Sequence, residues 1–462
     1  MTTEVDPQYK WTVMIYMAGD NNLSEECVYS LVEAKRALND QYKKLSVLAQ
    51  FDPSGERAQT KRYELSPKAT LEEDAKATKW TASETDSGEA QNLLEFLRWG
   101  IARSPAEHYM VVLVGHGSGT DDDFLLHDDN PPSALTILEL RYVFDKLTAD
   151  GHTIDILGFD TCLMNMAEVC FELLRTNVTY MVGSEGYSPN TGWPYKEVLE
   201  KLSDEKSDVM PLDLATHIVE KYRDFYVPYI NGGISIDQSV LEVKKIGEVK
   251  KQMSGLVEAL MDDLDKDKNK DFITKRNALL LAHWDAQSYN GEKFVDLHDF
   301  CDQLGARYLE VGVENEVTRK CQAVASEIDR LVVKTCIAGA AFQFSYGLSI
   351  YFPWAILSPT YGNLAFPKET GWLDYLIRYH TETQRPHRDR EQVRLPNSPY
   401  RATVPNNKGR DGHVESMRNP PSEEFIDNVG EDSKPPKHGP GTPDAKLSTK
   451  KDKETKNRNK DH

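Results

Sequence analysis

Residues 154–169 read IDILGFDTCLMNMAEV, a short apolar run that passes directly into a helical pattern. Similar runs rich in Val, Ile, Met and Tyr lie at residues 11–18, 45–51, 109–115 and 180–186. They are continuous rather than alternating in polarity, which is typical of strands covered on both faces. Helical patterns separate them at 24–38, 88–103 and 136–148. This order predicts right-handed β-α-β crossovers and an α/β fold with a mainly parallel central sheet.

The second half of the chain is less regular. Helical patterns are found at 164–175, 195–203, 211–226, 241–264, 273–286, 295–307 and 313–333. Strand-like segments lie at 232–237 and 346–353. Beyond about residue 384 the composition shifts to Pro, Lys, Arg, Asn and Asp. Such a segment buries too little apolar area to offset its chain entropy, so we expect residues 385–462 to form a disordered polar tail.

Charge divides the chain at the same place. Residues 385–462 hold 17 Lys and Arg against 13 Asp and Glu, so the tail carries +4 and residues 1–384 carry −23. A body of that charge repels phosphate backbones, and nucleic acid is not an expected partner. Six cysteines in 462 residues do not make a disulfide scaffold, and we find neither a membrane span nor a secretory signal. These features predict a cytoplasmic protein.

Two of the expected strands are followed by side chains that can take part in catalysis. One runs into Gly115-His116-Gly117, and another runs into Asp160-Thr161-Cys162. Ligand crevices of open α/β sheets lie at the carboxyl ends of the strands, so both side chains are expected at one edge. A thiol near a helix N-terminus gains thiolate character, and an imidazole can act as acid and base. The backbone N–H groups of Gly117 and Cys162 could hold an oxyanion.

Each residue also has a simpler interpretation. A free cysteine is often a small buried hydrophobe, and a histidine between glycines can be a structural turn residue. Spacing alone does not establish that His116 and Cys162 meet. The dyad and the structural interpretation therefore both stay open on these grounds.

Seven sequence blocks resemble the clostripain family of cysteine peptidases, whose fold is caspase-like. They are WTVMIYMAGDNNL at 11–23, VLVGHGSG at 112–119, ILGFDTCLMNMAEV at 156–169, VGSEGYSPNTGWPY at 182–195, GISIDQS at 233–239, FVDLHDF at 294–300 and YGLSIYFP at 346–353. The resemblance implies an N-terminal extension at 1–10 and a peptidase domain over 11–384. That domain would have an α-β-α core over about 11–240 and family-specific elements over about 241–384.

The resemblance also implies the chemistry. His116 and Cys162 would be the catalytic dyad, hydrolysing peptide bonds after Arg, and possibly Lys, through a thioester. Asp160 lies two residues before Cys162 on a strand, so both side chains are expected on one side, with the carboxylate lining a basic-residue pocket. Its alternative role is to cap the following turn. Glu185 and Trp193 are further candidates for contacting substrate, and Trp193 could equally be a buried anchor.

No cofactor is required for this chemistry, although relatives can need calcium. The acidic loop after His116 carries candidate ligands for that hard cation, namely Asp121, Asp122, Asp123 and Asp128. The alternative is a solvated acidic loop. Because residues 117–140 hold no Lys or Arg, self-cleavage there is not expected, and we predict a single-chain enzyme or activation elsewhere.

Two other functions are weighed against the peptidase. A catalytically silent caspase-like interaction module in a signalling or defence assembly would not need both His116 and Cys162. A nucleotide-binding protein would need a glycine-rich phosphate loop or a P-loop lysine, and the sequence offers neither. The sequence analysis therefore favours an endopeptidase acting on basic peptides.

Overall fold

A computed structural model describes residues 7–40, 44–55, 58–203, 208–265, 270–312, 316–354 and 356–383. The predicted tail and residues 1–6 of the predicted N-terminal extension lie outside the described residues. The first strand begins at Tyr9, so part of that extension belongs to the sheet.

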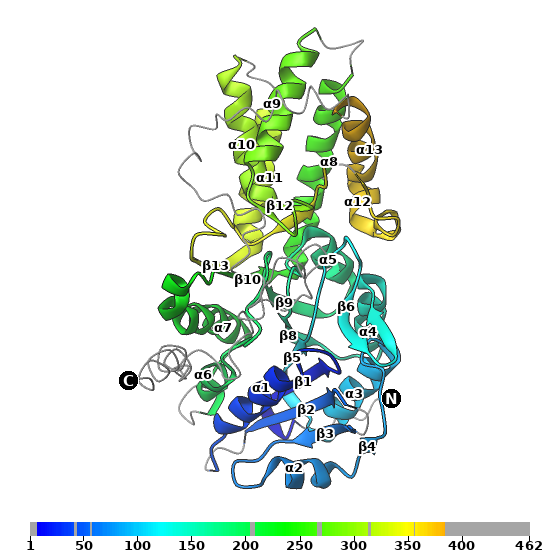
Figure 1. The fold of residues 1–462 in the computed structure, drawn as a ribbon, viewed down its shortest axis with the longest axis vertical. Coiled ribbons are helices and arrows are strands. Elements are labelled where there is room, and N and C mark those ends of the chain that lie inside the picture. Colours follow the sequence, from blue (N-terminus) through cyan, green and yellow to red (C-terminus); the bar gives the residue numbers. More distant parts are fainter. Residues whose placement is uncertain are drawn as a thin grey trace, which may run out of the picture.

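A nine-stranded sheet forms the lower half of the molecule in Figure 1, in the order β13-β10-β9-β8-β5-β1-β2-β3-β4. Its strands are β1 (Tyr9–Gly19), β2 (Leu45–Pro53), β3 (Thr60–Glu64), β4 (Thr81–Ala82), β5 (Ala106–Val114), β8 (Ile154–Asp160), β9 (Val178–Gly183), β10 (Ile236–Glu242) and β13 (Val332–Ala338). The five central strands, β9-β8-β5-β1-β2, are parallel. The strands at both edges pair antiparallel.

Helices cover both faces of this sheet. One face is covered by α1 (Ser24–Arg36), α6 (Tyr195–Glu200) and α7 (Pro211–Tyr226), and the other by α3 (Ala90–Arg103), α4 (Ile137–Ala149) and α5 (Ala167–Glu172). A short helix, α2 (Leu71–Thr78), joins β3 to β4 and begins with a capping box from Thr70 and Glu73. Two buried apolar clusters fill the space between helices and sheet, one on each side. The predicted α-β-α sandwich is thereby confirmed.

A helical unit stands above the sheet in Figure 1. It contains α8 (Ile246–Asp263), α9 (Phe272–Asp285), α10 (Leu297–Glu310), α11 (Glu316–Leu331), α12 (Ala365–Thr370) and α13 (Trp372–Thr383). A small sheet of β11 (Ser288–Tyr289), β12 (Phe294–Asp296) and β14 (Ser349–Tyr351) lies at its base. A hairpin of β6 (Leu125–Asp129) and β7 (Pro132–Leu135) follows His116.

Three expectations need adjustment. The strand expected at 232–237 begins at Ile236 instead, because residues 227–232 form a 3₁₀ turn. The segment expected to be helical from residue 164 forms its helix only from Ala167. A core ending near residue 240 is incomplete, since β13 from the second half pairs with β10 in the main sheet.

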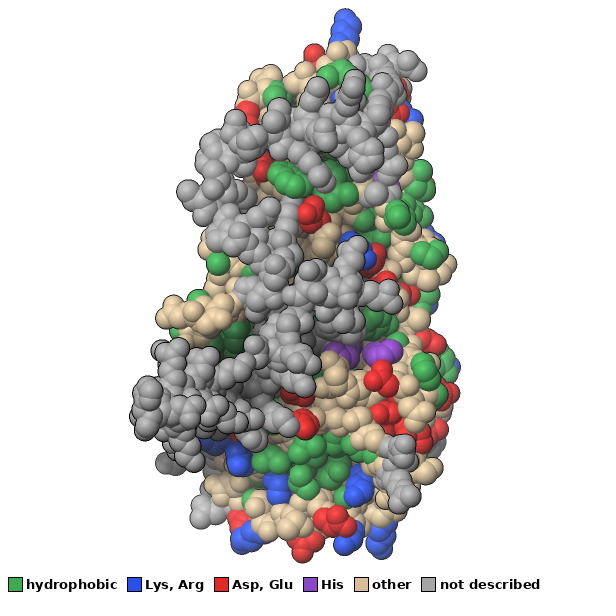
Figure 2. Space-filling model, in the orientation of Figure 1, with side chains coloured by type: hydrophobic (Ala, Val, Ile, Leu, Met, Phe, Trp, Pro, Cys, Tyr) green, Lys and Arg blue, Asp and Glu red, His purple; other side chains and the backbone are tan. Residues whose placement is uncertain are grey.

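The described surface matches the charge analysis. On the face drawn in Figure 2, acidic side chains gather along one side of the sheet-bearing half. No helix in the described part of the chain is both long and apolar enough to cross a bilayer.

Candidate active site

His116 and Cys162 come from neighbouring parallel strands. β5 and β8 pair directly, with Val114 opposite Asp160, so each candidate follows its strand end by two residues. The segments that follow β5 and β8 therefore leave the sheet at the same edge and at the same level, as expected for a crevice at the carboxyl ends of the strands.

The backbone after His116 lies against the backbone of Cys162. A Cβ atom at Gly117 would stand 2.8 Å from the carbonyl oxygen of Cys162 and 3.2 Å from the Thr161 side chain. Only glycine permits this approach without displacing a backbone atom. The structure thus brings the two candidate motifs into contact, which the spacing alone did not establish.

The imidazole of His116 is held by a residue that the sequence analysis missed. Its Nε2 lies 2.6 Å from Oδ1 of Asn22, which follows β1. With the amide oxygen as acceptor, Nε2 carries the proton and Nδ1 is the nitrogen that can take up or release one. A polar run, Asp20-Asn21-Asn22, directly after a buried strand was the available signal.

Cys162 lies in a tight turn that receives its polar contacts from the loop after β9. Ser188 donates its backbone N–H to Sγ over 3.3 Å. Leu163 has φ of 63°, a left-handed conformation for a residue with a Cβ, and donates its N–H to the Gly186 carbonyl over 3.0 Å. Contacts from residues 186–188 therefore fix the turn that presents the thiol.

The helix expected to activate Cys162 begins later than predicted. Met166 is the N-cap of α5, four residues beyond the cysteine. The field of a helix end falls off within the first turn, so a helix contribution to thiolate formation is weak here. The N–H of Ser188 is instead the group that donates to the sulfur.

Both candidate groups are enclosed. Cys162 is 0% exposed and His116 is 1% exposed. Tyr187 lies close enough to Cys162 for the sulfur to contribute to its raised pKa, whose main cause is burial, and its hydroxyl donates to Asn290 Oδ1 over 2.8 Å. In this structure the thiol and the imidazole are therefore covered by their neighbours.

The Asp160 carboxylate is buried beside the same loop. Its Oδ2 accepts from the Trp193 backbone N–H over 3.2 Å and from the Tyr195 hydroxyl over 2.9 Å. The segment 188–195 therefore contacts Cys162 at one end and Asp160 at the other. These two donors are neutral, and they belong to the segment after β9 rather than to the turn after Asp160.

Trp193 and Glu185 are both buried in packing contacts within the protein. The Trp193 indole is buried against Gly158 of β8, where a Cβ would lie 2.6 Å from the ring. This position favours the anchor interpretation. The Glu185 carboxylate accepts the Gly347 N–H over 2.7 Å and lies in a buried cluster with Asp237 and Asp296. It packs against the second half of the chain rather than lining a pocket.

The four candidate calcium ligands do not converge. Asp121 pairs with Lys293 and accepts from Tyr351, whereas Asp123 accepts the Ile137 N–H at the start of α4. Asp128 alone belongs to a group with suitable spacing, and its partners there are Asp52 and Glu84, with ligand atoms within 4.8 Å of one another. Among the described residues, the four carboxylates therefore do not form one cluster of ligand atoms.

Comparison with known proteins adds to this geometry. The model of the clostripain family, peptidase C11, matches residues 15–376. Clostripain from Hathewaya histolytica is 22% identical, and the match covers 64% of this chain and 65% of that protein. The chain thus spans about 65% of the length of this curated relative.

Two solved structures share the fold. A secreted C11 cysteine protease from Bacteroides thetaiotaomicron, bound to an irreversible peptide inhibitor, has a TM-score of 0.59 and 16% identity. An inactive zymogen C11 protease from Parabacteroides distasonis has a TM-score of 0.55 and 18% identity. Each match covers 79% of this chain and 99% of the other.

Proposed function

Because the chain belongs to the clostripain family, we propose that it is a cysteine endopeptidase that cuts after basic residues with His116 and Cys162. The observation that carries the proposal is the contact of the two motifs at one sheet edge, where Gly117 packs against the Cys162 carbonyl. The imidazole and the thiol each have a dedicated hydrogen-bond partner, Asn22 and Ser188.

The proposed reaction begins at the sulfur. The Cys162 thiolate attacks the scissile carbonyl, and the resulting oxyanion accepts from the N–H groups of Gly117 and Cys162. His116 donates a proton from Nδ1 to the leaving amine as the C–N bond breaks, which leaves a thioester. Water then loses a proton to His116 and attacks the thioester, the C–S bond breaks, and the acid product leaves, which restores the Cys162 thiolate and the protonated His116.

Asp160 is the proposed source of the preference for Arg, and possibly Lys. A buried carboxylate pairs strongly with a guanidinium, and the Trp193 and Tyr195 donors to Oδ2 carry no charge to compete with it. The carboxylate and the sulfur share one loop, residues 188–195, so a side chain bound at Asp160 would place its own carbonyl near Cys162.

Peptide hydrolysis tests both assignments. We expect the wild type to cleave fluorogenic peptides ending in Arg, and Cys162→Ala to have no activity. Asp160→Asn should lower kcat/KM for Arg about 30-fold to 100-fold, since a charge-assisted contact is worth about 2–3 kcal/mol. For peptides with citrulline in place of Arg, kcat/KM should be nearly the same in Asp160→Asn as in the wild type.

The matched control is Asp374→Asn, which changes an exposed carboxylate on α13. A wild type that fails to cleave any Arg, Lys or Asp peptide would favour the silent interaction module instead. The contact between the two motifs at Gly117 favours the peptidase over that module.

We also propose that Ca²⁺ binds at Asp52, Glu84 and Asp128 rather than at the loop aspartates. Burial raises the pKa of Asp52 to about 7 and that of Asp128 to about 6, and a cation would offset the repulsion among these carboxylates. Ca²⁺ should raise the melting temperature of the wild type and of Asp121→Asn, but not that of Asp52→Asn or Glu84→Gln. No shift in the wild type, or a shift kept in all variants, contradicts the assignment.

A cytoplasmic location is proposed on the state of the cysteines. All six lie among the described residues, all are buried, and none forms a disulfide. Free thiols of this kind suit a reducing compartment. Cell fractionation of the native protein tests the location.

A further inference from the structure

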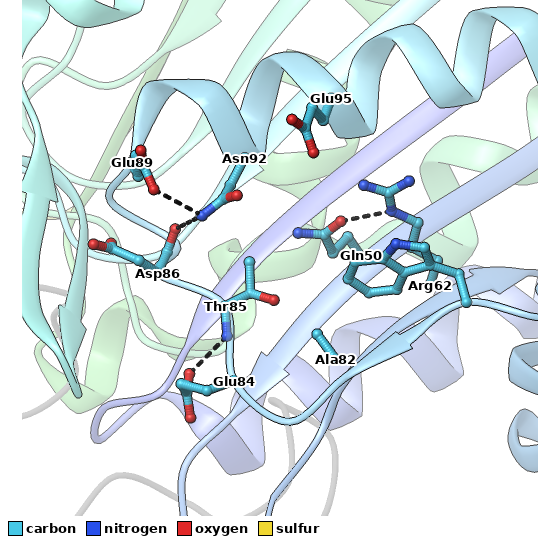
Figure 3. A pocket seen from close by; sticks show the side chains of 10 residues that line it. Gln50, Arg62, Ala82, Glu84, Thr85, Asp86, Glu89, Asn92 and Glu95 are labelled. Atoms are coloured by element: carbon cyan, nitrogen blue, oxygen red, sulfur yellow. Dashed lines mark hydrogen bonds between the residues drawn. The ribbon is translucent and has the colours of Figure 1, made fainter.

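A cavity of about 310 Å³ lies at the outer edge of the main sheet (Figure 3). Its walls come from β2, β3, the loop after β4 and the first turns of α3, and neither His116 nor Cys162 lines it. This volume is near the lower limit for small-molecule sites, so it suits a ligand of amino-acid size.

The only cationic side chain among the lining residues is Arg62 on β3. Arg62 is 6% exposed, and its Nε donates to Gln50 Oε1 over 2.8 Å. Its guanidinium lies over the ring of Trp80 at 4.2 Å and that of Trp99 at 5.1 Å. In Figure 3 the terminal nitrogens point into the space between Gln50 and Glu95.

Nothing in the described chain accepts a hydrogen bond from those terminal nitrogens or forms an ion pair with them at contact distance. Burial lowers the pKa of Arg62 to about 10, and the side chain is still charged at neutral pH. The carboxylate of Glu95 acts on this charge from beyond ion-pair distance, so the terminal nitrogens of the buried guanidinium still have donors for an anionic ligand.

The rim of the cavity has the opposite charge. Besides Glu84, which is assigned above to the proposed calcium site, it carries three carboxylates, from Asp86, Glu89 and Glu95. Within the described ranges none of them pairs with a Lys or Arg. A phosphate or other pure anion would be repelled by this rim, and a pure cation would be repelled by Arg62.

We propose that the cavity binds a small zwitterion, with its carboxylate on Arg62 and its cationic side chain among the rim carboxylates. Free arginine or lysine has this chemistry, and so does a short peptide that ends in a basic residue. Such an end is what cleavage after Arg or Lys releases. The link to the reaction therefore rests on the proposed function, whereas the binding itself does not.

Calorimetry on a catalytically inactive chain tests the proposal. In the double variant Cys162→Ala/Asp160→Asn, the proposed active-site pocket no longer offers a carboxylate to a basic ligand. We expect L-arginine to bind this chain. Agmatine, which lacks the carboxylate, and citrulline, which lacks the side-chain charge, should each bind at least 10-fold more weakly.

Variants at the cavity locate the binding. Adding Arg62→Gln should weaken arginine binding at least 10-fold. Since that change removes packing against two tryptophans, Glu89→Gln and Glu95→Gln serve as second variants at exposed positions and should weaken binding of arginine. Glu258→Gln, on the exposed side of α8, is the matched control and should change nothing.

Three results would overturn the proposal: no binding of arginine or lysine, equal binding of agmatine, or affinity unchanged by the cavity variants. Because the assay uses an inactive chain, none of these results depends on peptidase activity. Failure of the wild type to cleave peptides would in turn refute the proposed function and leave the binding result intact.

Discussion

Replacing Asn22 by Ala tests whether His116 must be held in one orientation. The change removes the 2.6 Å hydrogen bond to Nε2 while leaving both proposed catalytic groups in place. Losing a bond to a buried partner costs about 1–3 kcal/mol, but Asn22 itself is exposed, so water can replace part of it. We therefore expect the activation free energy to rise by about 1–2 kcal/mol, which lowers kcat/KM about 5-fold to 30-fold.

The assay is hydrolysis of an Arg peptide across pH, with Asn231→Ala as the control at another exposed asparagine. Asn22→Asp should restore a partner for Nε2 and raise the pKa of His116, moving the alkaline limb of kcat/KM upward. A merely structural role for Asn22 would leave that limb unmoved. Full activity of Asn22→Ala would refute the reasoning, because the imidazole would then need no such support.

Gly117→Ala should abolish activity, since its Cβ would stand 2.8 Å from the Cys162 carbonyl oxygen and one backbone must shift. Circular dichroism should show that the variant is folded. Hydrolysis by the variant at the wild-type rate would contradict the close approach of the two backbones. Burial raises the pKa of Asp237 and of Asp296 to about 7, and burial with the neighbouring charges also raises that of Glu185. The unfolded carboxyls titrate near pH 4, so the contribution of these three groups to stability is fully present below that pH and is lost as pH rises towards 7. Glu185→Gln removes one ionisable group and should flatten the decline in melting temperature from pH 5 to 8, whereas a decline as steep as in the wild type would argue against the cluster.

The sequence pattern predicted the fold best for strands that are buried on both faces of the sheet. The continuous apolar runs at 11–18 and 154–160 predicted β1 and β8 within two residues, because strands covered on both faces need apolar side chains throughout. The two catalytic candidates followed from the ends of β5 and β8. Their actual contact required the backbone approach at Gly117, which no periodicity encodes.

Tertiary contacts explain the remaining differences. The helical pattern from residue 164 is overridden because Asn165 donates to the Ser239 carbonyl over 3.2 Å and accepts from Ser349 over 3.0 Å. Glu185 follows a strand end, as a site residue would, yet its side chain is bound by Gly347 from a distant segment. Asp128 could not be separated from its neighbours in the acidic loop, since its partners Asp52 and Glu84 are remote in sequence.

Because β13 lies late in the sequence, the main sheet stays incomplete during synthesis until this strand has been made. Until Val332–Ala338 has left the ribosome, β10 presents an open row of backbone donors and acceptors along one side. Gly347 and Ser349, which bind Glu185 and Asn165 near the turn that contains Cys162, emerge later still. A nascent or truncated chain ending near residue 240 therefore carries Cys162 without the segments that brace its turn, and the unpaired edge makes such a fragment prone to self-association.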